Sequence, residues 1–127
     1  MRDYVVWLDY KSAHVFALNI SGIEKSIVKK KLKDFRPQNK HESKVDYNAE
    51  HYFRDLATRL KDAHQILLVG PGQAKAQLQD HFTTHQANTL AKKVIAIENF
   101  GSFEHKTEKQ LLAKASQFFR SYEHFNK

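Results

Sequence analysis

The stretch QILLVGPG, residues 65–72, decides the fold of this chain. Its apolar residues run without a polar interruption, which is typical of a short strand buried on both faces of a parallel sheet. Glycines and a proline then end the strand. Residues 72–85 show helical spacing, with Ala74, Leu78 and Phe82 four apart. A buried strand that leads through a glycine-rich turn into a helix predicts an α/β protein.

Three strands and a helix are predicted upstream of this stretch. Residues 4–9 (YVVWLD) are apolar and β-branched, as expected of a central strand. Residues 13–20 alternate between two faces, and residues 23–32 form a polar strand whose lysines suit a sheet edge. A polar loop is expected over 33–45. Apolar residues then recur every three or four positions over 47–63, which predicts a helix.

Downstream, residues 93–98 (KVIAIE) predict another buried strand, and a helix with a wide apolar stripe follows Thr107. The element order is therefore βββαβαβα. A three-stranded meander followed by two βα units, with parallel strands joined by right-handed crossovers, is the element order of the ribonuclease H-like fold. That fold implies one five-stranded mixed sheet of order 3-2-1-4-5. Ligands of such sheets bind where neighbouring parallel strands end, here at the ends of the 4–9 and 66–69 strands.

Length and composition narrow the class of protein. With 127 residues the chain fits one domain, residues 1–127, which we expect to be cytoplasmic. It has no cysteine, which excludes disulfides, thiolate metal sites and thiol nucleophiles. No apolar run approaches the roughly 20 residues of a membrane-spanning helix, so no membrane partner is expected.

The positive charge is concentrated in one part of the chain. The formal net charge is +7, and residues 25–44 contain eight basic and two acidic side chains. Such a cluster is the electrostatic pattern expected for a polyanionic partner, although lysines also protect exposed sheet edges. The candidate nucleic-acid-binding residues are Lys29, Lys30, Lys31, Lys33, Arg36, Lys40 and Lys44.

The turn after the 65–70 strand is a second candidate site. Gly70 and Gly72 allow a tight turn, and the following helix offers free N–H groups to an anion. Lys75 falls in the first helical turn, where the helix dipole disfavours a cation unless an anion is near. The alternative is a purely structural turn, which the local sequence by itself favours.

Catalytic chemistry has weaker support. Asp9 ends the first strand and could bind a metal ion in a nuclease, but the neighbouring strand ends in Gly70 instead of an acid, so we expect Asp9 to cap a turn. His81 and His85 are four apart on a helix without a further ligand in the pattern. We expect no catalytic residue, metal or cofactor. Four aromatic residues at strand ends or in loops could stack on bases, although we expect them to pack over the sheet: Tyr10, Phe35, Phe100 and Phe103.

Two stretches carry a family resemblance. Residues 66–72 with Lys75 and Leu78 resemble the Gly-Pro-Gly-x-x-Lys stretch in the middle domain of Pelota and of eukaryotic and archaeal class I release factors. The strand pair over 5–9 and 13–16 resembles small bacterial proteins called "translational machinery protein", single-domain relatives of that middle domain. The resemblance extends from Tyr4 to Phe119 and implies a ribonuclease H-like fold.

One departure from this family bears on activity. Release factors carry Gly-Gly-Gln in the loop before the long helix, where the glutamine positions the hydrolytic water. The matching loop, residues 33–45, has Gln38 without adjacent glycines. The resemblance therefore does not extend to peptidyl-tRNA hydrolysis, and the middle domain of Pelota also lacks this tripeptide.

These observations together predict a non-enzymatic protein of translation that binds rRNA or tRNA phosphates, with the ribosome or another structured RNA as its partner. One alternative is a metal-dependent nuclease or other hydrolase at the crevice near Asp9. Another is a protein-interaction module, a homodimer formed through an exposed sheet edge.

Overall fold

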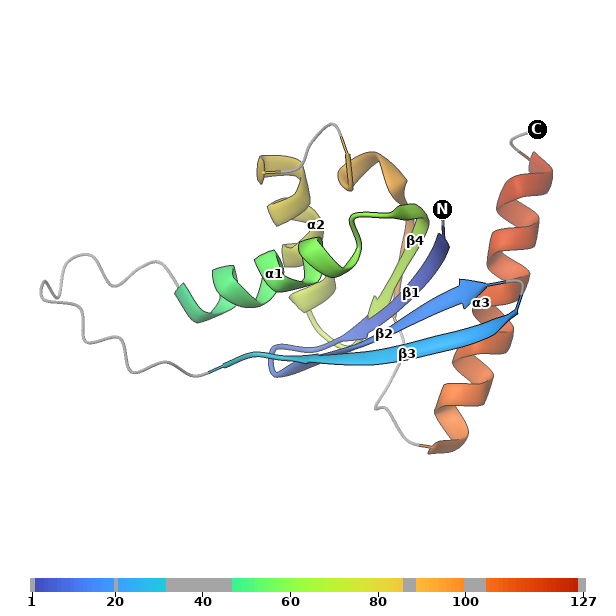
Figure 1. Cartoon of the computed structure of the whole chain (residues 1–127), viewed down its shortest axis with the longest axis horizontal. Coiled ribbons are helices and arrows are strands. Elements are labelled where there is room, and N and C mark those ends of the chain that lie inside the picture. The colour runs from blue at the N-terminus through green and yellow to red at the C-terminus, as the bar shows by residue number, and fades with distance from the viewer. Residues whose placement is uncertain (1, 20, 32–46, 86–88, 100–104, 126–127) are drawn as a thin grey trace, which may run out of the picture.

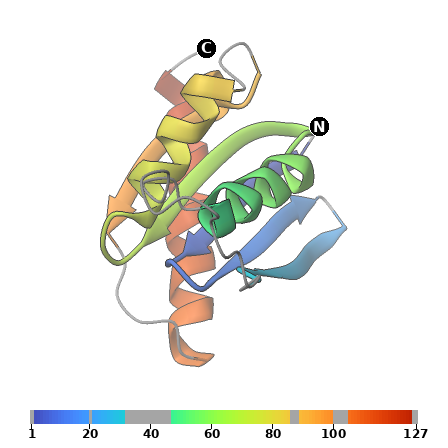
Figure 2. The same cartoon turned by 90° about the vertical axis from the view of Figure 1, so that its left-hand side faces the viewer.

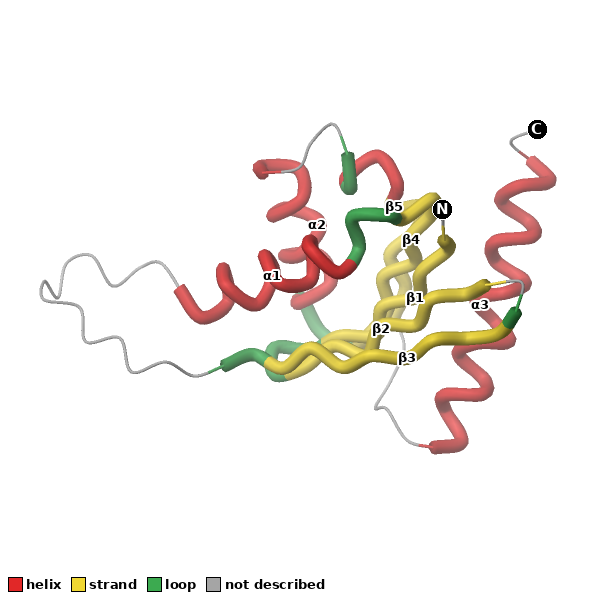
Figure 3. Tube along the Cα trace, in the orientation of Figure 1, coloured by secondary structure: helices red, strands yellow, loops and turns green. Residues whose placement is uncertain are grey.

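The fold is an α/β arrangement of one sheet and three long helices (Figures 1 and 3). A computed structural model describes residues 2–19, 21–31, 47–85, 89–99 and 105–125. The strands are β1 (Arg2–Leu8), β2 (Ser12–Asn19), β3 (Gly22–Lys29), β4 (Ala63–Gly70) and β5 (Val94–Asn99). The helices are α1 (Tyr47–Arg59), α2 (Ala74–His85), the short 3₁₀ helix η2 (Ala91–Lys93) and α3 (His105–Phe125).

The sheet has the strand order β3-β2-β1-β4-β5, which confirms the predicted topology. β1 pairs antiparallel with β2, and β2 pairs antiparallel with β3. β4 is parallel to both β1 and β5. β1, β3, β4 and β5 therefore point the same way, and β2 runs against them. This is the mixed sheet of the ribonuclease H-like fold predicted from the element order.

Helices cover both faces of the sheet. α1 and α2 lie on one face and α3 lies on the other (Figures 1 and 2). The alternation of side chains along β1 supplies both layers, because Val6 and Leu8 join the core under α1 and α2, whereas Val5 and Trp7 join the core under α3. None of the described helices is both long and apolar enough to cross a membrane.

The first helix is shorter than the sequence predicts. α1 ends at Arg59, and β4 begins at Ala63, which the apolar spacing had assigned to the helix. The Leu60 N–H is shared between the carbonyl oxygens of Leu56 and Ala57, at 3.1 and 3.2 Å, which tightens the last turn. Ala63 is fully buried opposite Arg2 of β1. Sheet pairing therefore overrides the helical pattern here.

Other features also differ from the prediction. The second helix begins at Ala74 instead of residue 72, because Gly72 has φ +66° and cannot belong to a right-handed helix. β3 ends at Lys29, so the predicted strand over 23–32 is too long. β5 was expected to be buried, yet it is an edge strand with Ile97 38% exposed. The predicted strand order already placed this strand at the edge, so the expectation of burial from its apolar sequence was wrong.

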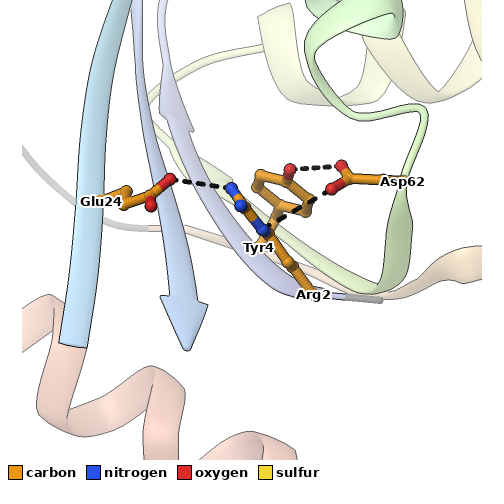
Figure 4. Close-up of polar contacts among 4 residues, drawn as sticks. All are labelled: Arg2, Tyr4, Glu24 and Asp62. Carbon is orange, nitrogen blue, oxygen red and sulfur yellow. Dashed lines mark hydrogen bonds and ion pairs between the residues drawn. The ribbon is translucent and has the colours of Figure 1, made fainter. Parts of the chain in front are cut away.

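A polar network fastens the beginning of β1 (Figure 4). The Arg2 guanidinium contacts Glu24 of β3 at 2.8 Å and Asp62 at 3.7 Å. The Tyr4 hydroxyl donates a short hydrogen bond to Asp62. Burial, followed by the hydrogen bond to Asp62, raises the pKa of Tyr4 to about 12. A second tyrosine, Tyr52, is also buried and has a raised pKa.

We expect the protein to lose stability in alkali as these two phenols ionise. An unfolded tyrosine has a pKa of about 10, so the folded chain holds protons that the unfolded chain releases. The contribution is complete below pH 10 and is lost as pH rises toward the folded pKa of Tyr4, about 12. Urea midpoints measured across this range should fall. Tyr4→Phe should cost about 1 kcal/mol at pH 8, the contribution of one hydrogen bond, and at pH 12 the variant should be at least as stable as the unaltered chain, because phenylalanine has no proton to lose. A difference that is the same at both pH values would contradict this account.

Candidate nucleic-acid interface

The two sites predicted from the sequence lie at the same edge of the sheet. Because β1, β3 and β4 point the same way, their carboxyl ends meet there. β3 brings Lys29 to this edge, and β4 brings Gly70. Three strand spacings separate β3 from β4, a distance of about 14 Å. The edge thus joins the end of the basic strand to the glycine turn.

Lysines at the end of β3 are accessible. Lys29 and Lys31 are exposed and Lys30 is half-buried. Within the described part of the chain, no carboxylate lies within ion-pair distance of Lys29 or Lys31. The other predicted contacts lie outside the described residues; they are Lys33, Arg36, Lys40 and Lys44.

Lys11 and Tyr10 join this cluster, which the sequence analysis missed. The backbone N–H of Lys30 donates to the carbonyl of Lys11 at 2.8 Å, so the turn between β1 and β2 lies directly beside the end of β3. Lys11 is exposed, and Tyr10 is 45% exposed. The expectation that Tyr10 packs over the sheet is therefore wrong. The sequence showed a turn here, but only the pairing of β2 with β3 places it beside the lysines.

Asp9 caps this turn, as predicted. One carboxylate oxygen accepts the N–H groups of Lys11 at 2.8 Å and Ser12 at 2.9 Å. The Tyr52 hydroxyl donates to the Asp9 carbonyl at 3.0 Å, which ties the turn to α1. In the described ranges no three His, Asp or Glu side chains are grouped as metal ligands. Asp9 therefore stabilises the turn between β1 and β2 at this edge.

The glycine turn is built around a buried lysine. Lys75 is 5% exposed, and its Nζ donates to the carbonyl of Gly72 at 2.6 Å. This contact offsets the unfavourable position of a cation in the first turn of α2. Gly70 has φ +140° and packs against the backbone of Leu8, so the glycine there is required by the approach of β4 to β1. Lys75 therefore faces inward and holds the turn together.

Not every lysine of the basic segment is directed to this edge. Lys25 pairs with Glu108 of α3 at 2.9 Å and lies 5.7 Å from the centre of the Phe16 ring. This contact ties the edge strand β3 to the helix on that face of the sheet. Among the described lysines of residues 25–31, the exposed ones at the carboxyl edge are therefore Lys29 and Lys31.

His81 and His85 line a different cavity. It has a volume of about 410 Å³, lies between α1 and α2, and also contacts Arg54 and Lys61. The two rings are 4.6 Å apart between centroids. Burial lowers the pKa of His81, and the neighbouring His85 lowers it further. Arg54 and Lys61 would repel a metal cation. We therefore assign His81 and His85 a structural role and not a metal-binding one.

The fold and this edge together define an α/β domain of the ribonuclease H-like class with a cationic end to its sheet. No protein-family model and no curated protein matches the sequence. Solved structures do match the fold. Pelota of Archaeoglobus fulgidus has a TM-score of 0.61 at 15% identity, over 98% of this chain and 37% of that protein.

Two further structures support the same likeness. The archaeal translation termination factor aRF1 matches with a TM-score of 0.55 at 15% identity, over 96% of this chain and 40% of its own. Saccharomyces cerevisiae Dom34, described as a translation termination-like factor involved in RNA quality control, matches with a TM-score of 0.58 at 15% identity, over 87% of this chain and 31% of its own. The chain thus spans well under half of each protein.

These comparisons confirm at the level of fold the resemblance to Pelota and release factors. At such low identity they establish the fold alone. The likeness to the bacterial "translational machinery protein" group stays a prediction.

Proposed function

We propose that this chain is a non-enzymatic protein of translation that binds rRNA or tRNA phosphates. The observation that carries the proposal is the group of lysines at the carboxyl edge of the sheet, Lys11 and Lys29–Lys31, because Lys29 and Lys31 have no described carboxylate beside them. Phosphates are the commonest polyanionic ligands of such a surface. The basic loop residues Lys33, Arg36, Lys40 and Lys44 would extend the same contact.

The glycine turn would assist phosphate binding through its positive electrostatic potential. Lys75 is buried, so its ammonium would reach a phosphate through electrostatic attraction and not through direct contact. The free N–H groups at the start of α2 add to the positive potential. Gly70, Gly72 and Lys75 would therefore contribute less to anion binding than the lysines at the end of β3.

The translation setting rests on the structural neighbours, which include a translation termination factor and a termination-like factor involved in RNA quality control. The proposal that the chain does not hydrolyse peptidyl-tRNA rests on the sequence. The four glycines of the chain are never adjacent, so no Gly-Gly-Gln is present. Ribosomal RNA and tRNA are accordingly the RNAs in which we expect the binding sites.

We expect RNA affinity to fall steeply with salt and to depend on the end of β3. Replacing Lys29, Lys30 and Lys31 by Gln should reduce the slope of log affinity against log salt by about 2 to 3, since each neutralised phosphate contributes about 0.7 to 0.9. Affinity at low salt should fall roughly 10- to 100-fold for every RNA sequence, because lysine–phosphate contacts carry no base readout. Fluorescence anisotropy with a labelled tRNA and with an rRNA fragment measures both quantities.

The matched control removes three exposed lysines elsewhere, with Lys92, Lys109 and Lys114 replaced by Gln. It lowers the net charge equally but leaves the carboxyl edge intact. Equal losses in the two triple variants would show that only net charge matters and would refute the interface. Failure of the unaltered protein to bind either RNA at low salt would refute the proposed function. Light scattering should give both variants the same mass as the unaltered protein.

Association with the ribosome is tested in a cell lysate. The protein should sediment with ribosomal particles in a sucrose gradient at low salt and move to the top at high salt. The Lys29–Lys31 variant should remain near the top under both conditions.

A further inference from the structure

We propose that the interface takes an unpaired segment of RNA and stacks one base on Tyr10. This inference rests on the proposed function and specifies which form of RNA the site prefers. The observation behind it is an exposed aromatic ring in the same turn as the exposed Lys11, whose backbone carbonyl accepts a hydrogen bond from the N–H of Lys30, directly after β3.

Tyr10 stands apart from the other aromatic residues. Among the Tyr, Phe and Trp side chains whose burial the structure describes, it alone is exposed. Trp7, Phe16 and Tyr52 from neighbouring positions of the fold are all buried. An exposed aromatic side chain leaves apolar surface in water, and a turn offers many polar residues that would avoid this cost. Its place in the cationic cluster indicates a partner with a flat apolar face.

The turn that carries Tyr10 is held on several sides. The Asp9 N–H donates to the Ser12 carbonyl at 3.0 Å, and the Asp9 carboxylate accepts from the N–H groups of Lys11 and Ser12. Tyr52 of α1 holds the Asp9 carbonyl. On the other side, the Lys11 carbonyl is bonded to Lys30. Because the backbone is fixed before the ligand arrives, little ordering entropy opposes stacking.

The chemistry of this surface suits single strands. Lysines bind successive phosphates without regard to sequence, and an aromatic ring stacks on any base whose face is open. In a duplex both faces of a base are already covered by its neighbours, and the major groove of A-form RNA is too narrow for a side chain to enter. The ring therefore adds affinity only where a base is unstacked, as in a loop, a bulge or a strand end.

The test compares oligouridine with an RNA duplex of the same length, using the full chain and its Tyr10→Ala and Tyr10→Phe variants. Tyr10→Ala should weaken oligouridine binding about 5- to 100-fold, the range seen when a stacking aromatic is removed, and should leave duplex binding unchanged. The salt slope should stay the same for both RNAs, because no phosphate contact is lost. Tyr10→Phe should retain binding, since the ring remains. A fluorescent adenine analogue within oligouridine should be quenched by the unaltered protein and by Tyr10→Phe, but less by Tyr10→Ala.

Each result bears on one proposal or the other. If the unaltered protein binds both RNAs but Tyr10→Ala loses nothing, or loses the same factor for the duplex, stacking is wrong while phosphate binding stands. If the unaltered protein binds neither RNA, the proposed function fails and the inference fails with it. A urea midpoint of Tyr10→Ala equal to that of the unaltered protein shows that any lost binding is not lost folding.

Discussion

Gly70→Ala is expected to destabilise the protein by at least about 4 kcal/mol, a loss seen only when a buried feature of the fold is broken. A Cβ at this position would overlap the carbonyl oxygen of Leu8 and lie 3.2 Å from its carbonyl carbon. Leu8 is fully buried in β1, so its backbone cannot move aside without disturbing the central strand pair. The φ of +140° adds backbone strain for any residue with a side chain.

Gly72→Ala is the matched control, since it makes the same chemical change two residues away. Gly72 also has a positive φ, +66°, but a Cβ there would meet nothing within 4 Å. Only the left-handed backbone penalty applies, roughly 1 to 2 kcal/mol. Urea denaturation of both variants measures the difference, and circular dichroism shows whether Gly70→Ala folds at all. Similar losses in the two variants would mean that β4 does not approach β1 as described.

Phe82→Ala is the second large effect that we expect, a loss of about 3 to 5 kcal/mol. Phe82 is fully buried and belongs to the core between α2 and the sheet, together with Leu78 and Leu90. Removing the ring leaves a cavity that the surrounding side chains fill only in part. Since small domains are stable by about 5 to 15 kcal/mol, this variant should unfold at a much lower urea concentration.

Tyr10→Ala serves as the control for that prediction, because it also replaces an aromatic side chain by a methyl group. Tyr10 is exposed, so the expected change is within about 0.5 kcal/mol. Chemical denaturation followed by Trp7 fluorescence compares both variants with the unaltered chain. A small loss in Phe82→Ala would show that α2 is not packed on the sheet through this ring.

Much of the fold followed from local patterns. The apolar run over 66–69 predicted a buried strand, and the alternation over 13–20 predicted a second strand. The order of elements then led to the sheet order that the structure has. The errors lie where tertiary contacts compete with spacing. Ala63 fits a helical stripe equally well, but its pairing with Arg2 draws it into β4. The partial exposure of β5 follows from its edge position, which the predicted strand order contained but its apolar sequence concealed.

The candidate site divides in the same way. Charge density along the chain singled out Lys29, Lys30 and Lys31, and the structure places Lys29 and Lys31 on the surface. Lys75 looked like an accessible cation from its position after two glycines, whereas the structure buries it against the Gly72 carbonyl. Exposure of a long side chain is decided by what packs around it, so sequence spacing cannot reveal it.

The amino-acid sequence alone determined that this chain is an α/β protein with a concentrated positive charge and no Gly-Gly-Gln, because periodicity, charge and motifs are properties of neighbours along the chain. Only the tertiary structure decided that Tyr10 and Lys11 stand beside the end of β3, and that Lys75 turns inward. The first relation depends on the register in which β2 pairs with β3, and the second on how the side chains around the glycine turn pack, and both are cooperative outcomes of burial in the folded chain.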